Sequence, residues 1–351
     1  MKKFVSFIRN FLVISTITFV ILEITLRLML GFETNKFVFT KTEAGYIARF
    51  KPNASFIHEI ENINGVALNN LGFHDKTYTQ EGDSLYRIGF IGDSFVAGYE
   101  VPLTDAFTTK LNQELNTDTH KYSCYNFGTP GTASAYQYVL YNSLLKDVVD
   151  IDHMFICVFL DNDFYDNSPY RDSYRRFDWV IDTNGVSQKN NSYSVFRKAI
   201  DFTRSYSVAI NTLYEFAYET IKNTSHTNKS GNEDPEIAQF QKFTAHDSTV
   251  VKMTIDLIAN WISELKIEGI KADVIVFRSD YNFLARENYF NTQIKSKSED
   301  IGFNVVDVRF SKPDLKHFEF EDEGVMKLGH FNELGHDSVS DILFQYIKQL
   351  N

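Results

Sequence analysis

The sequence predicts a three-layer α/β/α fold with a five-stranded parallel sheet, preceded by an N-terminal transmembrane helix. Two observations support this prediction. From Tyr86 onward, short apolar runs of strand length alternate with segments whose apolar residues recur at helical spacing. Strands that alternate with helices form right-handed βαβ units, and their parallel sheet is covered on both faces. Near the N-terminus, residues 10–22 form an uninterrupted uncharged run.

The N-terminal run is long enough to cross a bilayer. Lys2, Lys3 and Arg9 precede it, and the chain stays apolar to Phe32 apart from Glu23 and Arg27. The positive residues ahead of the run keep the N-terminus in the cytoplasm and place the rest of the chain outside. A cleaved signal peptide is the alternative, but no A-x-A-like site follows the run, so an uncleaved anchor over residues 1–32 is favoured.

Three further regions follow the anchor. Residues 33–85 read as an extended stem that packs on the main domain, because they show turns but no helical period. Residues 86–351 form the main domain, with a helical insertion at about 168–250. Within the insertion we expect a helix at about 194–222 and a mobile polar loop at 223–236.

The main domain supplies each layer in chain order. Strands are expected at 86–91, 121–127, 154–160, 272–277 and 304–308, and helices at 105–116, 134–147, 285–300 and 333–349. A further amphipathic helix carries Val251, Ile255, Ile258, Ile262 and Leu265 on one face and ends at Gly269.

Composition excludes two classes of protein. The formal net charge of -11 and the lack of a basic stripe beyond the N-terminus exclude a nucleic-acid partner. Cys124 and Cys157 each lie in an apolar run without a C-x-x-C partner, so they are expected to be small buried hydrophobic residues rather than zinc ligands. The spacing of His330 and His336 does not match a two-histidine metal site, so no metal and no cofactor are expected.

Polar residues follow several of the expected strands. Gly92-Asp93-Ser94 ends the first strand, a glycine-rich loop with Gly131 follows the second, and Asn162 follows the third. His330 lies ahead of the last helix. Because the carboxyl ends of parallel strands meet at one edge of a sheet, these residues are expected to converge there. Each alone is weak evidence, since Gly-Asp-Ser is also a common turn.

Together these residues resemble the SGNH hydrolases, also called the GDSL esterase/lipase family, and in particular their membrane-anchored bacterial branch. Ser94 matches the nucleophile of the first block, Gly131 and Asn162 match the second and third, and His330 matches the fifth. The segment NNLGFHD at 69–75 also resembles one that the anchored proteins carry ahead of the domain. The resemblance spans residues 69–351 and implies the flavodoxin-like SGNH fold.

The chemistry expected of these residues is acyl transfer through a serine. A serine hydroxyl becomes nucleophilic when a neutral imidazole takes its proton, and His330 is the candidate base. The backbone N–H groups of Ser94 and Gly131 and the side-chain amide of Asn162 are candidates for the oxyanion hole.

One member of the family pattern is missing. The family carries a carboxylate two or three residues before the histidine, but those positions hold Leu328 and Lys327. Asp322 is the first candidate for the orienting acid, with Glu321 and Glu323 beside it. A backbone carbonyl that holds the ring, leaving a Ser-His dyad, is the other arrangement.

The sequence therefore predicts an extracytoplasmic, single-pass membrane-anchored serine esterase at the periplasm or cell surface. Its expected substrates are O-acyl esters, above all O-acetyl esters of cell-envelope carbohydrate, with no nucleic-acid partner. The alternatives are an O-acyltransferase on the same scaffold and a catalytically idle SGNH-fold binding or assembly protein. A lipase or phospholipase is a third reading.

Overall fold

The structure is a computed structural model of the 351-residue chain. It describes residues 2–30, 37–43, 45–58, 64–79, 85–117, 121–160, 162–169, 179–188, 200, 203–204, 206–214, 216–217, 245–277, 284–308, 319–322 and 325–350. The side chains at 2, 30, 39, 46, 57–58, 64, 245–247, 284–287, 319–322 and 325–328 are outside this description. Two compact units are present: Met1–Val38 with Ser192–Asn232, and Phe39–Asn191 with Glu233–Asn351. We refer to them, after the roles expected from the sequence, as the anchor unit and the catalytic unit.

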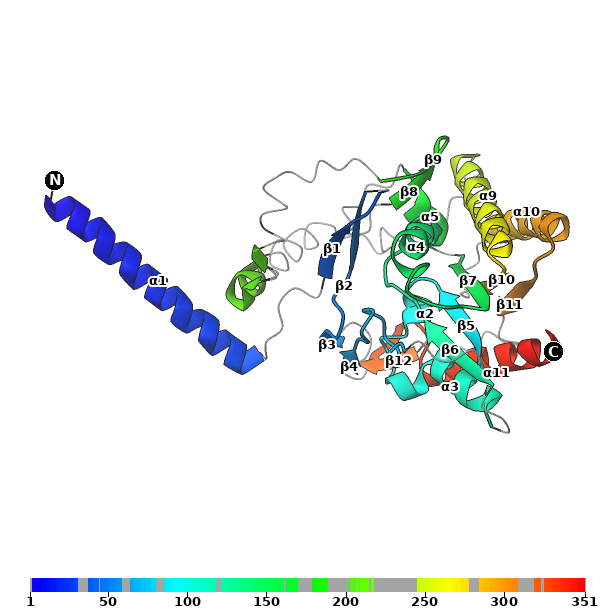
Figure 1. Ribbon diagram of the computed structural model, residues 1–351, viewed down its shortest axis with the longest axis horizontal. Helices are drawn as coiled ribbons and strands as arrows, with labels where there is room; N and C mark the ends of the chain where they lie inside the picture. Colours follow the sequence, from blue (N-terminus) through cyan, green and yellow to red (C-terminus); the bar gives the residue numbers. More distant parts are fainter. Residues whose placement is uncertain are drawn as a thin grey trace. The chain divides into compact units, whose positions relative to one another are not determined.

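The catalytic unit is built on a five-stranded sheet with the order β11-β10-β7-β5-β6 (Figure 1). All four neighbouring pairs are parallel. The strands are β5 (Tyr86–Ile91), β6 (Tyr122–Asn126), β7 (His153–Phe159), β10 (Lys271–Phe277) and β11 (Val305–Val308). This confirms the predicted five strands and the doubly wound order. The order reverses between β5 and β7, and ligands bind open α/β sheets at the carboxyl ends of the strands beside such a reversal.

Helices cover both faces of the sheet. One layer holds α3 (Phe107–Leu115) and α11 (Glu333–Leu350), which pack against each other. The opposite layer holds α4 (Ser134–Leu140), α5 (Asp163–Asn167), α9 (Ala245–Ile267) and α10 (Leu284–Ile301), with α9 packed against the other three. The expected helix at 134–147 continues past α4 as a π-helical turn, Tyr141–Leu145.

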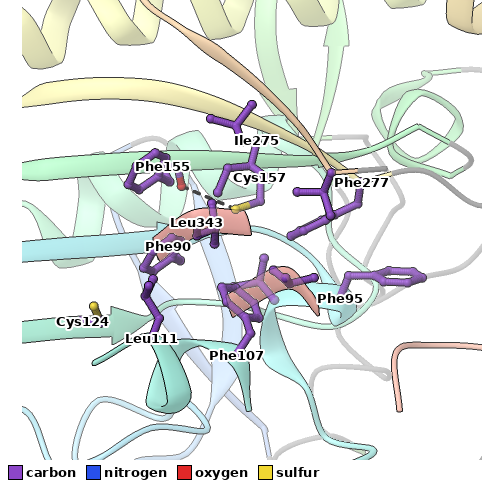
Figure 2. Close-up of a cluster of buried hydrophobic side chains, with 14 of the residues drawn as sticks. Phe90, Phe95, Phe107, Leu111, Cys124, Phe155, Cys157, Ile275, Phe277 and Leu343 are labelled. Carbon is purple, nitrogen blue, oxygen red and sulfur yellow. Dashed lines mark hydrogen bonds between the residues drawn. The ribbon is translucent and has the colours of Figure 1, made fainter. Parts of the chain in front are cut away.

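Side chains that alternate along the strands form the core beneath α3 and α11. Phe90, Phe155 and Phe277 point to this face, and Leu111 and Leu343 of the two helices meet them (Figure 2). Period-two alternation places every second strand residue on the same face. Both cysteines are free and buried, as expected, and their strands β6 and β7 are separated by β5.

Residues 37–79 form more structure than an extended stem. They contain strands β1 (Phe37–Lys41) and β2 (Tyr46–Phe50), which pair, and a hairpin of β3 (Ser55–His58) and β4 (Asn64–Ala67). From residue 39 onward this segment belongs to the catalytic unit. Its side chains are buried in that unit: Val66, Phe73 and His74 each have 5% or less of their surface exposed.

The expected helical insertion at 168–250 begins with a β-hairpin. Strands β8 (Trp179–Asp182) and β9 (Gly185–Gln188) are antiparallel. The turn between them forms because Asp182 Oδ1 accepts the Asn184 amide at 2.7 Å and Gly185 takes a φ of 108°. Helical residues follow within 200–217, while the polar tract at 223–236 lies outside the described residues. A second hairpin pairs β12 (Glu319–Asp322) with β13 (Val325–Leu328).

The anchor unit contains α1 (Lys2–Leu30), a continuous helix. Among the described residues it is the one helix long and apolar enough to cross a membrane, with a mean hydropathy of 2.0 over Lys3–Met29 and none of that window buried. Length and composition of this kind suit a membrane anchor and a signal sequence alike.

Candidate active site

Ser94 lies at a sharp strand-to-helix turn at the end of β5. It is the first residue of the four-residue helix α2 (Ser94–Ala97). The Phe95 amide donates to Asp93 Oδ1 at 2.9 Å, which caps this helix, and Gly98 ends it with a left-handed φ of 59°. Gly92 has no room for a side chain, because a Cβ there would lie 2.4 Å from Val96 Cγ2. The turn therefore fixes a half-buried Ser94 at the carboxyl edge of the sheet.

His330 meets Ser94 from the other end of the domain. Its Nε2 lies 2.7 Å from Ser94 Oγ, although 236 residues separate the two in the chain. Phe331 anchors this segment, because its ring is 1% exposed and packs edge-on against Phe277. Asn332 Oδ1 accepts the Gly335 amide at 3.0 Å and so caps α11 immediately after the histidine. The sequence-predicted pair is thus brought within hydrogen-bonding distance.

A buried carboxylate occupies the other side of the His330 ring. Glu100 Oε1 lies 3.3 Å from His330 Nδ1, and the Glu100 side chain is 2% exposed. Glu100 follows Gly98 in the turn after α2, between Tyr99 and Val101, which are both buried. The three groups Ser94, His330 and Glu100 therefore form a continuous line of oxygen, imidazole and carboxylate.

Sequence reasoning missed Glu100 and placed the acid near His330 in the chain. The backbone of Asp322 lies in β12, but its side chain is outside the described residues. The signal that points to Glu100 is its setting: a single carboxylate in the apolar turn "GYEVP", six residues after the nucleophile. A charged residue in such a turn is costly to bury unless it has a partner.

Asp93 adds a second buried carboxyl group near the imidazole. Burial raises its pKa to about 7, and the charges of Asp166 and Glu100 act in the same direction. The Phe95 amide and the charge of His330 oppose this rise. The electrostatic surroundings of the imidazole therefore include Asp93 as well as Glu100.

Gly131 and Asn162 lie on the next two loops of the same edge. The loop after β6 is tied to the nucleophile turn, because the Thr129 amide donates to the Gly92 carbonyl at 2.9 Å. Gly131 in this loop has a φ of 71°. Asn162 directly precedes α5 after β7, and its Nδ2 lies 3.4 Å from Asp166 Oδ2. The loops that carry the expected oxyanion donors therefore follow β6 and β7, the two strands on either side of β5 and its nucleophile turn.

Gly128 holds the β6 loop against the backbone of α2. A Cβ at this position would lie 2.2 Å from the Ala97 nitrogen and 2.6 Å from the Val96 carbonyl carbon. Asn126 reinforces the contact, because its Nδ2 donates to the Val96 carbonyl at 2.8 Å. Only glycine permits this approach of the two backbones.

His336 supports a helix rather than the reaction. Its ring is 1% exposed, and Nδ1 accepts the Phe107 amide at 3.2 Å at the start of α3. Ala106, the residue at the N-cap of α3, has no side-chain acceptor, so the imidazole takes that role. Burial, with the charges of Lys110, His74 and His330, lowers the pKa of His336 to about 3 and keeps the ring neutral.

The segment at 69–75 forms hydrogen bonds with α2 and with β6 next to the site. His74 Nδ1 donates to the Ala97 carbonyl at 3.1 Å, at the C-terminal end of α2. Asp75 Oδ2 accepts the Asn126 amide at 2.9 Å, next to the loop that carries Gly128. The motif ahead of the domain is therefore part of the site's support.

Comparison with known proteins gave structural likenesses. No family model and no curated protein matches the chain. A protein described as lipolytic and of the G-D-S-L family from Desulfitobacterium hafniense matches 74% of this chain and 98% of its own, with 10% identity and a TM-score of 0.34. A psychrotrophic esterase from Pseudoalteromonas sp. matches 75% of this chain and 97% of its own (11% identity, TM-score 0.42). An acetyl xylan esterase matches 74% and 99% (13% identity, TM-score 0.38).

These proteins carry the G-D-S-L and esterase names of the family that the sequence motifs resemble. The identities and TM-scores are low, so the roles assigned below depend on the residues and distances of this chain.

Proposed function

We propose that the chain is a membrane-anchored serine esterase with Ser94 as nucleophile, His330 as base and Glu100 as the orienting acid. One observation carries the proposal: His330 lies 2.7 Å from Ser94 Oγ through Nε2 and 3.3 Å from Glu100 Oε1 through Nδ1. Nucleophile, base and orienting group in this arrangement are the geometric signature of covalent acyl transfer. The buried carboxylate beside Nδ1 weighs against the catalytically idle protein, which was motivated by the missing acid.

The first half of the reaction acylates Ser94. Nε2 of neutral His330 takes the hydroxyl proton as Oγ attacks the ester carbonyl, and Glu100 holds the ring with Nδ1–H toward its carboxylate. The tetrahedral oxyanion is received by the backbone N–H groups of Ser94 and Gly131 and by the Asn162 amide. Each such donor contributes on the order of 3 kcal/mol to lowering the barrier. The imidazolium then gives its proton to the leaving alkoxide, which departs as an alcohol.

The second half frees the enzyme. Nε2 takes a proton from water, the hydroxide attacks the acyl carbonyl, and the proton returns to Ser94 Oγ as the carboxylic acid leaves. The net reaction is ester plus water giving alcohol plus acid. If a sugar hydroxyl reaches the acyl-enzyme in place of water, the same steps give acyl transfer.

The proposed location and substrate follow from α1. Lys2, Lys3 and Arg9 all lie at the N-terminal end of α1, so we place the N-terminus in the cytoplasm and the catalytic unit outside. An enzyme tethered there meets cell-envelope material first. O-acetyl esters of envelope carbohydrate are the substrate class that we propose, and attack on an ester needs no metal or cofactor.

The test of the nucleophile is intact-mass detection of a covalent adduct after treating the full-length protein in detergent with a fluorophosphonate. We expect one adduct on the wild type and none on Ser94→Ala, because only an activated serine reacts. Cys124 and Cys157 are both buried, so they offer no competing site. A folded wild-type protein that takes up no adduct contradicts the proposal and favours the binding protein.

The test of the substrate uses acetylated envelope polysaccharide with labelled acetyl groups. Free acetate indicates an esterase, and label moved to an unlabelled acceptor polymer indicates a transferase. If neither is seen with a protein that reacts with the fluorophosphonate, the proposed substrate class is wrong and the nucleophile stands.

A further inference from the structure

Glu23 and Arg27 are the two charged residues in the C-terminal half of the apolar helix α1, and they pair with each other. Arg27 Nε lies 2.7 Å from Glu23 Oε1, one helical turn away. Both side chains are shielded, with 29% of Arg27 and 15% of Glu23 exposed. An i, i+4 pair reduces the cost of charge near a membrane, but it leaves acceptor and donor capacity on both groups.

Residues 206–209 of the insertion form hydrogen bonds with Glu23 and Arg27. The amides of Val208 and Ala209 donate to Glu23 at 3.1 and 3.0 Å, and the Ser207 hydroxyl donates to Glu23 Oε2 at 2.8 Å. Arg27 Nη2 donates to the Tyr206 carbonyl at 2.7 Å. The first amides of a helix lack partners within it and attract a negative charge. Glu23 therefore caps the helical residues 208–214, and Arg27 fixes the residue ahead of them.

The buried side of this helix packs within the anchor unit. Val208 and Ala209 have 2% or less of their surface exposed. Arg204 is also 1% exposed, donates to Asn211 Oδ1 at 3.1 Å, and stacks 3.7 Å from the centre of the Tyr214 ring. These contacts fix which face of the helix turns outward.

The outward face is apolar. Tyr206, Leu213 and Phe216 are 67%, 63% and 74% exposed. Elsewhere in the described residues outside α1, exposed large hydrophobic side chains are far apart in the chain: Val148, Ile267, Leu334 and Leu350. A cluster of exposed aromatic and aliphatic side chains marks an interaction surface, and this one is joined by direct hydrogen bonds to a helix whose own exposed surface is apolar.

The position of Glu23 along α1 indicates what covers this face. Residues 4–23 span about 30 Å at 1.5 Å per residue, which is the thickness of the hydrocarbon core. Arg9 lies in the second turn of this stretch, where its long side chain can extend to the cytoplasmic interface. A bilayer crossed by this stretch places Glu23 and Arg27 at the far interface. The helix that they hold then lies at head-group level, where Tyr and Phe side chains are favoured beside apolar ones.

We propose that the helical residues 206, 208–214 and 216–217 form a membrane-contact segment that Glu23 and Arg27 latch to the anchor, with Tyr206, Leu213 and Phe216 in the interface of the bilayer that α1 crosses. The inference rests on the anchor part of the proposed function and not on the chemistry of Ser94. Its consequence is that the insertion of the catalytic domain is tethered to the membrane surface at a second point.

The test uses the full-length protein in phosphatidylcholine liposomes, with single cysteines carrying an environment-sensitive fluorophore and with lipid-borne nitroxide quenchers. Leu213→Cys probes the surface, Val13→Cys probes the middle of α1, and Ile267→Cys is the matched control, an 87% exposed apolar residue of the catalytic unit. We expect quenching at Leu213 several-fold above that at Ile267 and near that at Val13. The buried Cys124 and Cys157 set the labelling background, measured on the unmodified chain.

Glu23→Ala tests the latch. With it, quenching at Leu213 should fall toward the Ile267 value while quenching at Val13 is retained. The opposite result, in the protein that keeps Glu23, is that Leu213 is quenched no more than Ile267 while Val13 is quenched. That result overturns the membrane contact and indicates a protein partner or solvent at this face. An unquenched Val13 overturns the premise that α1 is inserted. Fluorophosphonate labelling of Ser94 in the same samples reports separately on the catalytic proposal.

Discussion

Opposite edges of the same sheet each hold a histidine–carboxylate pair. At the carboxyl edge, His330 lies 3.3 Å from Glu100. At the amino edge, His153 Nε2 lies 2.9 Å from Asp273 Oδ2, at the start of β7 and β10. Helix α11 reaches both, because it begins three residues after His330 and its Tyr346 hydroxyl donates to Asp273 at 2.9 Å.

The two pairs differ in what else contacts them. Asp273 also accepts the Asn304 amide at 2.7 Å, and the His153 ring is 3% exposed and stacks on Phe155. His330 is 28% exposed, and its second nitrogen faces the hydroxyl of Ser94. A saturated, closed pair ties elements of the fold together. A pair with a nucleophile on the free nitrogen and access from solvent can move a proton to a substrate.

The largest expected effect is on kcat/KM, and it should distinguish Glu100 from Asp273. Glu100→Gln should lower kcat/KM by about 10⁴, because the amide no longer favours the reactive orientation and charge of His330. Asp273→Asn should leave kcat/KM unchanged in the fraction that is folded. Asp322→Asn should also leave it unchanged. Ester hydrolysis measured at 25 °C, with the melting temperature of each variant, makes the comparison; loss of activity in Asp322→Asn with none in Glu100→Gln would return the orienting role to Asp322.

Glycines at the two edges should also respond differently. Gly128→Ala places a Cβ 2.2 Å from the Ala97 nitrogen. Its expected cost is on the order of 3 kcal/mol of unfolding free energy, and displacement of α2 should lower activity about 100-fold. Gly302 at the amino edge has a φ of 78°. A Cβ added there would have room, because the nearest atom to it would be Lys266 Nζ at 3.7 Å. Gly302→Ala should therefore cost about 1 kcal/mol and leave the remaining enzyme active.

Urea denaturation and initial rates on the same preparations test these values. Gly65→Ala in β4 is the neutral control, since a Cβ there meets nothing within 4 Å. Equal losses of activity in Gly128→Ala and Gly302→Ala would show that contact with α2 does not set the geometry of Ser94.

The smallest expected effect is on the pH dependence of the free energy of unfolding. Asp93 at the carboxyl edge and Asp273 at the amino edge should change this dependence in opposite directions. Burial raises the pKa of Asp93 to about 7 from 3.8, so the folded state binds more protons than the unfolded state between these values. This carboxyl group makes stability fall as the pH rises from about 4 to about 7. Asp93→Asn keeps the oxygen that caps Phe95 and removes the titration. The stability of Asp93→Asn relative to the wild type should therefore increase from pH 4 to pH 8, as measured by urea denaturation at the two pH values.

Asp273 should behave in the opposite way. Burial raises its pKa, but the hydrogen bonds from His153, Asn304 and Tyr346 outweigh this and lower the pKa below its ordinary value of 3.8. Its contribution is then complete above about pH 4 and is lost as the pH falls through the lowered pKa. The stability advantage of the wild type over Asp273→Asn should shrink below pH 4 in thermal unfolding. An advantage that grows in acid would contradict this assignment.

Much of the fold was predictable because its signals are local. The strand-length apolar runs gave β5, β6, β7, β10 and β11, and helical period gave α3, α9, α10 and α11 close to their observed bounds. The hairpin β8–β9 was missed because residues 168–250 were taken as a helical insertion, although Asn184-Gly185 in its turn is a local hairpin signal. The stem was expected to pack on the main domain, but the pairing of β1 with β2 and of β3 with β4 was not predicted, because it depends on which segments meet in the fold.

The sequence by itself determined the sheet, the apolar N-terminal helix and the two ends of the site, Ser94 and His330, because period, turn residues and motif spacing are written along the chain. The tertiary structure decided which acid faces the histidine. Glu100 is six residues from Ser94 and far from His330 in sequence. It reaches Nδ1 because Gly98 ends α2 in a left-handed turn, while the packing of Phe331 and the capped start of α11 hold His330 at the same edge. That proximity is a property of the folded packing of three segments, so no local pattern contains it.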